Sequence, residues 1–149
     1  MPKKTYKLTK KTFLVLLVAF VLLEAGIFVS SDPNFFQRST LTAYAGQILE
    51  TCSGESYRPS CYDREIPKLM DVISMEETFR VTKLIQERDS EYWYCHVLGH
   101  DLSGLETAKD PDNWKDVAAR CPSTMCSNGC LHGAFQERFR AESLPDVEI

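Results

Sequence analysis

Cys95-His96-Val97-Leu98-Gly99-His100 opens a segment that closes with Cys121-Pro-Ser-Thr-Met-Cys126-Ser-Asn-Gly-Cys130-Leu-His132-Gly133. All three histidines of the chain and four of its six cysteines lie within this segment. Imidazole and thiolate groups ligate borderline and soft metals, and thiols also take part in redox chemistry. The segment therefore predicts a metal site or a redox site.

The spacing of the histidines favours a metal site. His96 and His100 lie four residues apart in a segment with helical features, so both rings occupy one helix face. Gly99 and Ser103 lie on or beside that face, and their small side chains would let a second helix come close. His132 is the remaining histidine and the expected third ligand. The alternative is that these histidines are hydrogen-bonded packing residues.

Three imidazoles with a free position for water would accept zinc, copper or iron, and we expect zinc. Asp101 and Glu137 are candidates for orienting the ligands from outside the coordination shell, as carboxylates commonly do. No obvious general base completes the site, so the sequence leaves open whether the protein is an enzyme.

The disulfide pattern decides which side chains remain for chemistry, because a thiol in a disulfide cannot ligate zinc. Six cysteines are an even number, and disulfides are the expected state outside the cytoplasm. A turn-rich loop at residues 53–60 predicts a local bridge around it, and a bridge near the histidines would draw their helices together. The predicted pairs are Cys52–Cys61, Cys95–Cys130 and, by elimination, Cys121–Cys126.

Two alternatives to the histidine site follow from the same residues. If the thiols stay reduced, Cys95, His100, Cys126 and Cys130 could hold a structural zinc. If no metal binds, the chain is a helical module cross-linked by disulfides that presents a surface to an unknown protein partner.

The N-terminal residues predict export. Residues 1–12 contain five lysines and no acid, and residues 13–29 are apolar apart from Glu24 and Gly26. A basic flank before an apolar run is typical of a transmembrane anchor or a signal peptide. We expect an anchor through residues 13–29, with residues 1–12 in the cytoplasm and the remainder periplasmic or extracellular. Cleavage of a signal would instead give a secreted protein.

Residues 30–149 form one predicted extracytoplasmic domain of modest size. This domain contains 12 Lys and Arg against 20 Asp and Glu, a net charge of −8. Nucleic-acid binding depends on neutralising phosphates with basic side chains, so the acidic balance argues against that class of partner.

The periodicity of the domain predicts an all-α fold, a small bundle of about six short helices after the N-terminal hydrophobic helix. Asp32-Pro33, Asp110-Pro111 and the Ser74-x-x-Glu77 capping box mark helix starts. Ser90 is a further candidate cap. No segment shows strand alternation between hairpin turns. The predicted helices are 33–52, 66–73, 75–88, 91–105, 110–120 and 128–141.

Several side chains are expected in the core. Phe79, Leu84 and Ile85 form the buried stripe of the helix at 75–88, with Val81 at its margin. The aromatic run Tyr92-Trp93-Tyr94 is expected to pack around the histidine site rather than to form a separate ligand surface.

Three known kinds of site do not match the spacing, although covalent haem attachment is a near miss. Covalent haem attachment needs a histidine directly after the second cysteine, but Leu131 separates Cys130 from His132. A zincin protease needs glutamate after its first histidine, where this chain has Val97. A thioredoxin-like centre needs Cys-x-x-Cys, which occurs nowhere in the sequence.

Overall fold

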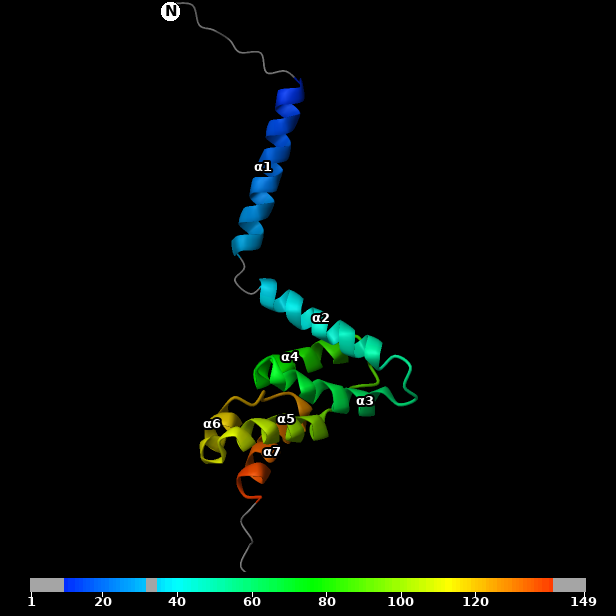
Figure 1. Cartoon of the computed structure of the whole chain (residues 1–149), viewed down its shortest axis with the longest axis vertical. Helices are drawn as coiled ribbons and strands as arrows, with labels where there is room; N and C mark the ends of the chain where they lie inside the picture. The colour runs from blue at the N-terminus through cyan, green and yellow to red at the C-terminus, as the bar shows by residue number, and fades with distance from the viewer. Residues whose placement is uncertain (1–9, 32–34, 141–149) are drawn as a thin grey trace, which may run out of the picture. The chain divides into compact units, whose positions relative to one another are not determined.

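The described part of the chain is entirely helical, as the sequence predicts. The computed structural model describes residues 10–31 and 35–140, and no strand occurs within them. The α-helices, labelled in Figure 1, are α1 Lys10–Ser31, α2 Phe35–Thr51, α3 Arg58–Glu65, α4 Met75–Gln86, α5 His96–Lys109, α6 Trp114–Ala119 and α7 Gly129–Arg138. Three short 3-10 helices are η1 Ile66–Asp71, η2 Pro111–Asn113 and η3 Cys126–Asn128.

The chain divides into two compact units, residues 1–39 and residues 40–149. Helix α1 belongs to the first unit, and apolar side chains of residues 13–22 are exposed on it. The predicted membrane span at 13–29 has no support here, because no helix in the described residues is long and apolar enough to cross a membrane. The basic residues 1–9 and the Asp32-Pro33 helix start lie outside the described residues.

Helix α3 was not predicted, because the turn-forming residues around it suggested a loop. Pro59 occupies its first turn, where the missing N–H costs nothing, and this was the available signal. The helix continues directly into η1, so the predicted 66–73 helix is found as a 3-10 helix over Ile66–Asp71. The predicted Cys52–Cys61 disulfide is confirmed and joins the end of α2 to α3, with Cα atoms 5.7 Å apart.

Helix α4 begins where the capping box predicts. The Ser74 hydroxyl accepts a hydrogen bond from the Glu77 backbone N–H, and the Glu77 carboxylate accepts one from the Ser74 backbone N–H at 2.9 Å. Phe79 and Ile85 are buried as expected. Val81 was placed at the margin but is fully buried, whereas Leu84 is only partly buried.

Helix α5 starts later than predicted, at His96 instead of residue 91. Ser90 is exposed and does not cap the helix, because the residue before it, Asp89, holds the chain in a turn. Asp89 is buried, and its carboxylate accepts a hydrogen bond from the Glu91 backbone N–H at 3.0 Å. The chain therefore stays irregular from residue 90 to Cys95.

The Asp89 carboxylate also joins this irregular segment to α3. It accepts hydrogen bonds from the Arg58 guanidinium at 2.7 and 3.1 Å and from the Tyr62 hydroxyl at 2.6 Å. These donors hold the pKa of Asp89 well below its usual range, with Arg58 the larger influence. Burial, together with the hydrogen bond to Asp89, raises the pKa of Tyr62 to about 12.

Helix α5 is central to residues 40–149, since it contacts α4, η1, α6 and α7. Its most extensive contact is with α7. Leu98 and Leu102 of α5 are fully buried in the core that it shares with α4.

The last predicted helices are found with shifted ends. The 110–120 segment forms η2 followed by α6, and the 128–141 segment forms α7, which ends at Arg138. Arg120, just after α6, hydrogen-bonds Glu76 of α4 at 2.7 Å and Glu106 of α5 at 3.0 Å. The three helices are thus tied together at one cation.

Candidate metal centre

Helices α5 and α7 lie unusually close because glycines line their contact. A Cβ atom at Gly129 would collide with the carbonyl oxygen of His96, and one at Gly133 would collide with the carbonyl oxygen of His100. A Cβ at Gly99 would come within 2.9 Å of the Cys130 backbone nitrogen. Any larger residue at these positions would push the two helices apart.

The glycine contacts also fix the direction of the two helices. Gly129 meets His96 and Gly133 meets His100, so both chains advance by four residues between contacts. The helices therefore run in the same direction, and His132 emerges at the level of the two histidines of α5. The Gly129-x3-Gly133 spacing, which matches His96-x3-His100, is a sequence signal that the histidine pattern alone did not use.

The three predicted histidines converge on one point. Their ring centroids are 4.8 Å apart for His96 and His100, 5.4 Å for His96 and His132, and 5.5 Å for His100 and His132. One ligand nitrogen from each ring lies within 4.8 Å of the others. The Nε2 atoms of His96 and His100 are 3.1 Å apart. Two nitrogens on one tetrahedral zinc would be about 3.3 Å apart, from bonds of about 2.0 to 2.1 Å.

Backbone carbonyls orient the His96 ring. Its Nδ1 lies 3.1 Å from the carbonyl oxygens of both Cys126 and Ser127. A carbonyl oxygen can only accept a hydrogen bond, so Nδ1 is the protonated nitrogen and the Nε2 lone pair faces His100. Metal-bound histidines are commonly held in this way, with the second ring nitrogen donating to a carbonyl or carboxylate.

These two carbonyls project from a left-handed turn. Cys126, Ser127 and Asn128 have φ of 53°, 47° and 65°, although none is glycine. This left-handed conformation costs a residue other than glycine roughly 1–2 kcal/mol. Such strain persists where the surroundings enforce it, and it often marks a functional site. Here the turn delivers both acceptors to His96.

A disulfide links the first residue of this turn to the start of α5, and it differs from the predicted pairing. Cys95 bridges to Cys126, with Cα atoms 4.6 Å apart, and Cys121 bridges to Cys130. The predicted pairs Cys95–Cys130 and Cys121–Cys126 are therefore wrong. The reason is the left-handed turn, which places Cys126 rather than Cys130 beside the start of α5.

No cysteine remains free to ligate a metal, since all six form disulfides. This removes the alternative in which Cys95, His100, Cys126 and Cys130 hold a structural zinc. The candidate metal ligands that remain are the three imidazoles, and no thiolate competes with them for an ion.

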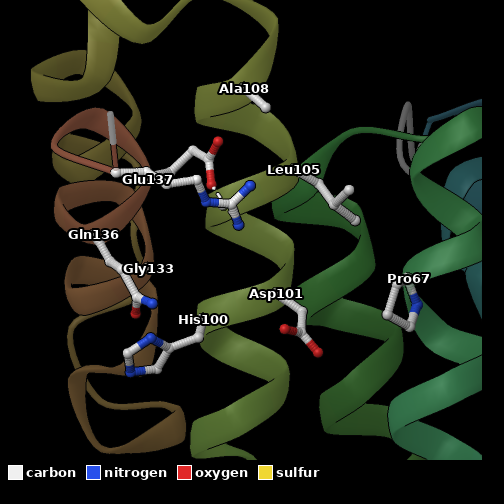
Figure 2. A pocket seen from close by; sticks show the side chains of 10 residues that line it. Pro67, His100, Asp101, Leu105, Ala108, Gly133, Gln136 and Glu137 are labelled. Atoms are coloured by element: carbon white, nitrogen blue, oxygen red, sulfur yellow. Dashed lines mark ion pairs between the residues drawn. The ribbon is translucent and has the colours of Figure 1, made fainter. Parts of the chain in front are cut away.

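The candidate orienting carboxylates do not contact the rings. Within the described residues, neither Asp101 nor Glu137 hydrogen-bonds a histidine; Glu137 instead forms an ion pair with Arg140 at 3.0 Å. Both carboxylates line a hollow beside His100 (Figure 2). Partial desolvation raises the pKa of Asp101, and the nearby His100 opposes this shift.

The aromatic run before α5 behaves unevenly. Tyr94 stacks on the His96 ring, with centroids 6.0 Å apart and planes at 20°. Tyr92 is buried and donates a hydrogen bond to Asp63 at 2.7 Å. Trp93 is 78% exposed, so the expectation that the whole run packs around the histidines is wrong for this residue.

No protein-family model, curated protein or solved structure matches the chain. A proposal for the function therefore has to start from the chemistry of the three-histidine group. Three imidazoles leave a tetrahedral ion one position for water or another ligand. His96 and His100 are partly buried while His132 is exposed, so solvent reaches the group from the side of α7.

Proposed function

We propose that residues 40–149 form a metal-binding domain in which His96, His100 and His132 coordinate one transition metal ion, with zinc the metal expected to occupy the site. The supporting observation is the convergence of three ligand nitrogens, from two helices, within 4.8 Å of one another. Three imidazole ligands with an open fourth position are characteristic of zinc sites that bind water or substrate.

The arrangement of the apo chain favours binding because little has to move. The His96 tautomer already presents its Nε2 lone pair to the neighbouring ring. The Cys95–Cys126 disulfide and the glycine contacts keep α5 and α7 in place before any ion arrives. A metal therefore gains its coordination energy without first ordering a flexible segment.

The disulfides also indicate where the domain works. Three bridges, with every cysteine paired, suggest an oxidising extracytoplasmic environment. Metal binding by this domain is accordingly proposed to take place outside the cytoplasm.

Zinc titration of the full oxidised chain tests the proposal, with a chromophoric chelator as competitor. We expect one zinc ion per chain, and at least about 100-fold weaker binding for His96→Ala and for His132→Ala, because loss of a ligand removes a coordinate bond. The double variant Cys52→Ser with Cys61→Ser is the control for general destabilisation, and we expect it to retain zinc. Equal zinc affinity in all of these proteins would contradict the proposal.

The identity of the metal is tested by the same competition with manganese, copper and zinc. An all-imidazole site should follow the usual order of divalent ions, with manganese weakest and copper tighter than zinc. Tightest binding of manganese would point instead to oxygen ligands and would rule out coordination by the three rings.

A further inference from the structure

A hollow of about 350 Å³ adjoins the metal centre and has a volume typical of small-ligand pockets. All four of His100, Asp101, Gln136 and Glu137 line it; in Figure 2 the His100 ring extends from α5 toward α7, whereas the Asp101 side chain extends from α5 on the side of Pro67. Pro67 of η1 forms part of the opposite side. His100 belongs to both the hollow and the histidine group, so a ligand in the hollow lies next to the ion.

The shape of the hollow follows from small residues on α5. His100, Gly104 and Ala108 succeed one another at four-residue spacing and all line it. Gln136 of α7 and Arg140, just after α7, line it four and eight residues beyond His132. Since Gly104 and Ala108 offer little side-chain volume, the space opposite the longer side chains stays open. The row from His100 to Ala108 extends about 12 Å at 1.5 Å per residue.

The wall of the hollow contains a carboxylate, that of Asp101, with no ion-pair or hydrogen-bond partner in the described residues. Asp101 forms no ion pair there, and its carboxylate points from α5 toward Pro67 (Figure 2). Asp63 lies close to it and is likewise without an ion pair in the described chain, its one hydrogen bond coming from the Tyr92 hydroxyl. Burial raises the pKa of Asp63, and the charge of Asp101 adds to that effect.

The other charged residues that line the hollow do not pair with Asp101. Glu137 and Arg140 pair with each other, so the cation at the far end is already satisfied. A bound zinc ion would place two positive charges beside His100, opposite in sign to the Asp101 side. The hollow would then present a cation whose open position accepts a carboxylate oxygen and, elsewhere on its wall, the unpaired Asp101 carboxylate.

We propose, building on the zinc site proposed above, that this hollow binds a short linear zwitterion. The carboxylate of the ligand occupies the open position on the metal, and its ammonium group faces Asp101. A phosphorylated ligand is disfavoured, because its additional negative charge would lie beside the Asp101 carboxylate.

Calorimetric titration of the zinc-loaded full chain with 6-aminohexanoate tests this ligand class. Its two charges are too far apart to chelate a single ion, so zinc is not extracted. We expect hexanoate, which lacks the ammonium group, to bind about fivefold more weakly, the size of one partly exposed ion pair. Hexylamine, which lacks the carboxylate, should bind at least about tenfold more weakly, since it forfeits metal coordination.

A charge reversal at Asp101 sharpens the test. Asp101→Lys should prefer the dicarboxylate adipate over 6-aminohexanoate, while Glu87→Lys, which reverses an exposed charge on a distant segment, should keep the original preference. Zinc content is measured on every sample. Loaded protein that ignores 6-aminohexanoate, or that binds hexanoate equally well, would overturn the ligand proposal and leave the metal site standing. Failure to take up zinc would overturn both.

Discussion

Two regions within residues 40–149 are built differently. The region up to α4 is held by apolar burial, one local disulfide and the buried contact between Arg58 and Asp89. The region from α5 to α7 is held by two further disulfides, by glycine contacts between helices and by a left-handed turn. The first region is stabilised by burial, cross-linking and an ion pair. The second contains a strained turn and close helix contacts, and these bring three imidazoles together.

The two regions differ in what their side chains do: those of the first stabilise the fold, and those of the second also form the candidate metal group. Side chains of the first region are either buried or solvated, and none gathers into a ligand group. The second region brings three imidazoles together at partly buried and exposed positions, where they could hold a metal ion. A substitution in the first region should therefore change stability alone, whereas one in the second should change stability and zinc binding together.

The largest effect is expected from Gly133→Val, which forces branched carbons into the His100 carbonyl and the Ser103 hydroxyl. Separation of α5 from α7 should weaken zinc binding by at least about 100-fold and destabilise the fold by roughly 3 kcal/mol. Gly104→Ala, in α5 where no atom lies within 4 Å of the new Cβ, is the control. We expect it to gain up to about 1 kcal/mol in chemical denaturation. Zinc binding by Gly133→Val at full strength would show that the close approach is unnecessary.

The second effect compares the disulfides of the two regions. Loss of Cys95–Cys126, which closes a loop of 31 residues, should cost about 3.7 kcal/mol in the chain-entropy treatment. Loss of Cys52–Cys61, with a separation of 9 residues, should cost about 2.6 kcal/mol. Serine pairs at each bridge, measured by urea unfolding and zinc titration, test this. Only the first pair should lose zinc affinity, and equal losses would remove the distinction between the regions.

A third effect concerns acid stability and belongs to the first region. Because Arg58 and Tyr62 lower the folded-state pKa of Asp89, its carboxylate stabilises the fold fully above its unfolded value of about 4. That contribution declines as the pH falls from there toward the depressed folded pKa. Asp89→Asn should lower the denaturation midpoint at neutral pH and flatten its decline below about pH 4. An unchanged acid profile would contradict the role of Asp89, and zinc affinity at pH 7 should stay as in the parent.

The smallest effect is expected at the capping box. Ser74→Ala removes the acceptor for the Glu77 backbone N–H at the start of α4 and should cost about 1 kcal/mol. Thermal unfolding measures the loss, and Ser60→Ala, at an exposed position inside α3, is a matched control. Any change in zinc binding by Ser74→Ala would show that the two regions are coupled more tightly than their contacts suggest.

Local signals explain what could be predicted from the sequence. The capping box located α4 because its hydrogen bonds lie within four residues, and the four-residue spacing of His96 and His100 placed both rings on one face. The all-α fold followed from the same kind of short-range pattern.

Long-range contacts explain what could not be predicted. Helix α5 begins late because the buried Asp89 contacts residues about thirty positions earlier. The disulfide partners of Cys95 and Cys121 depend on a left-handed turn formed by three residues that rarely adopt it. Neither feature leaves a periodic trace in the sequence.

The bridge between Cys95 and Cys126 gives the metal centre a dependence on its surroundings. In a reducing compartment the newly made chain lacks this link, so the two carbonyls that hold the His96 ring, those of Cys126 and Ser127, lose their covalent tie to the start of α5. The nascent polypeptide would thus be a poor competitor for intracellular zinc. Formation of the disulfide would then determine in which compartment, and from which available metal ions, the three imidazoles first bind an ion.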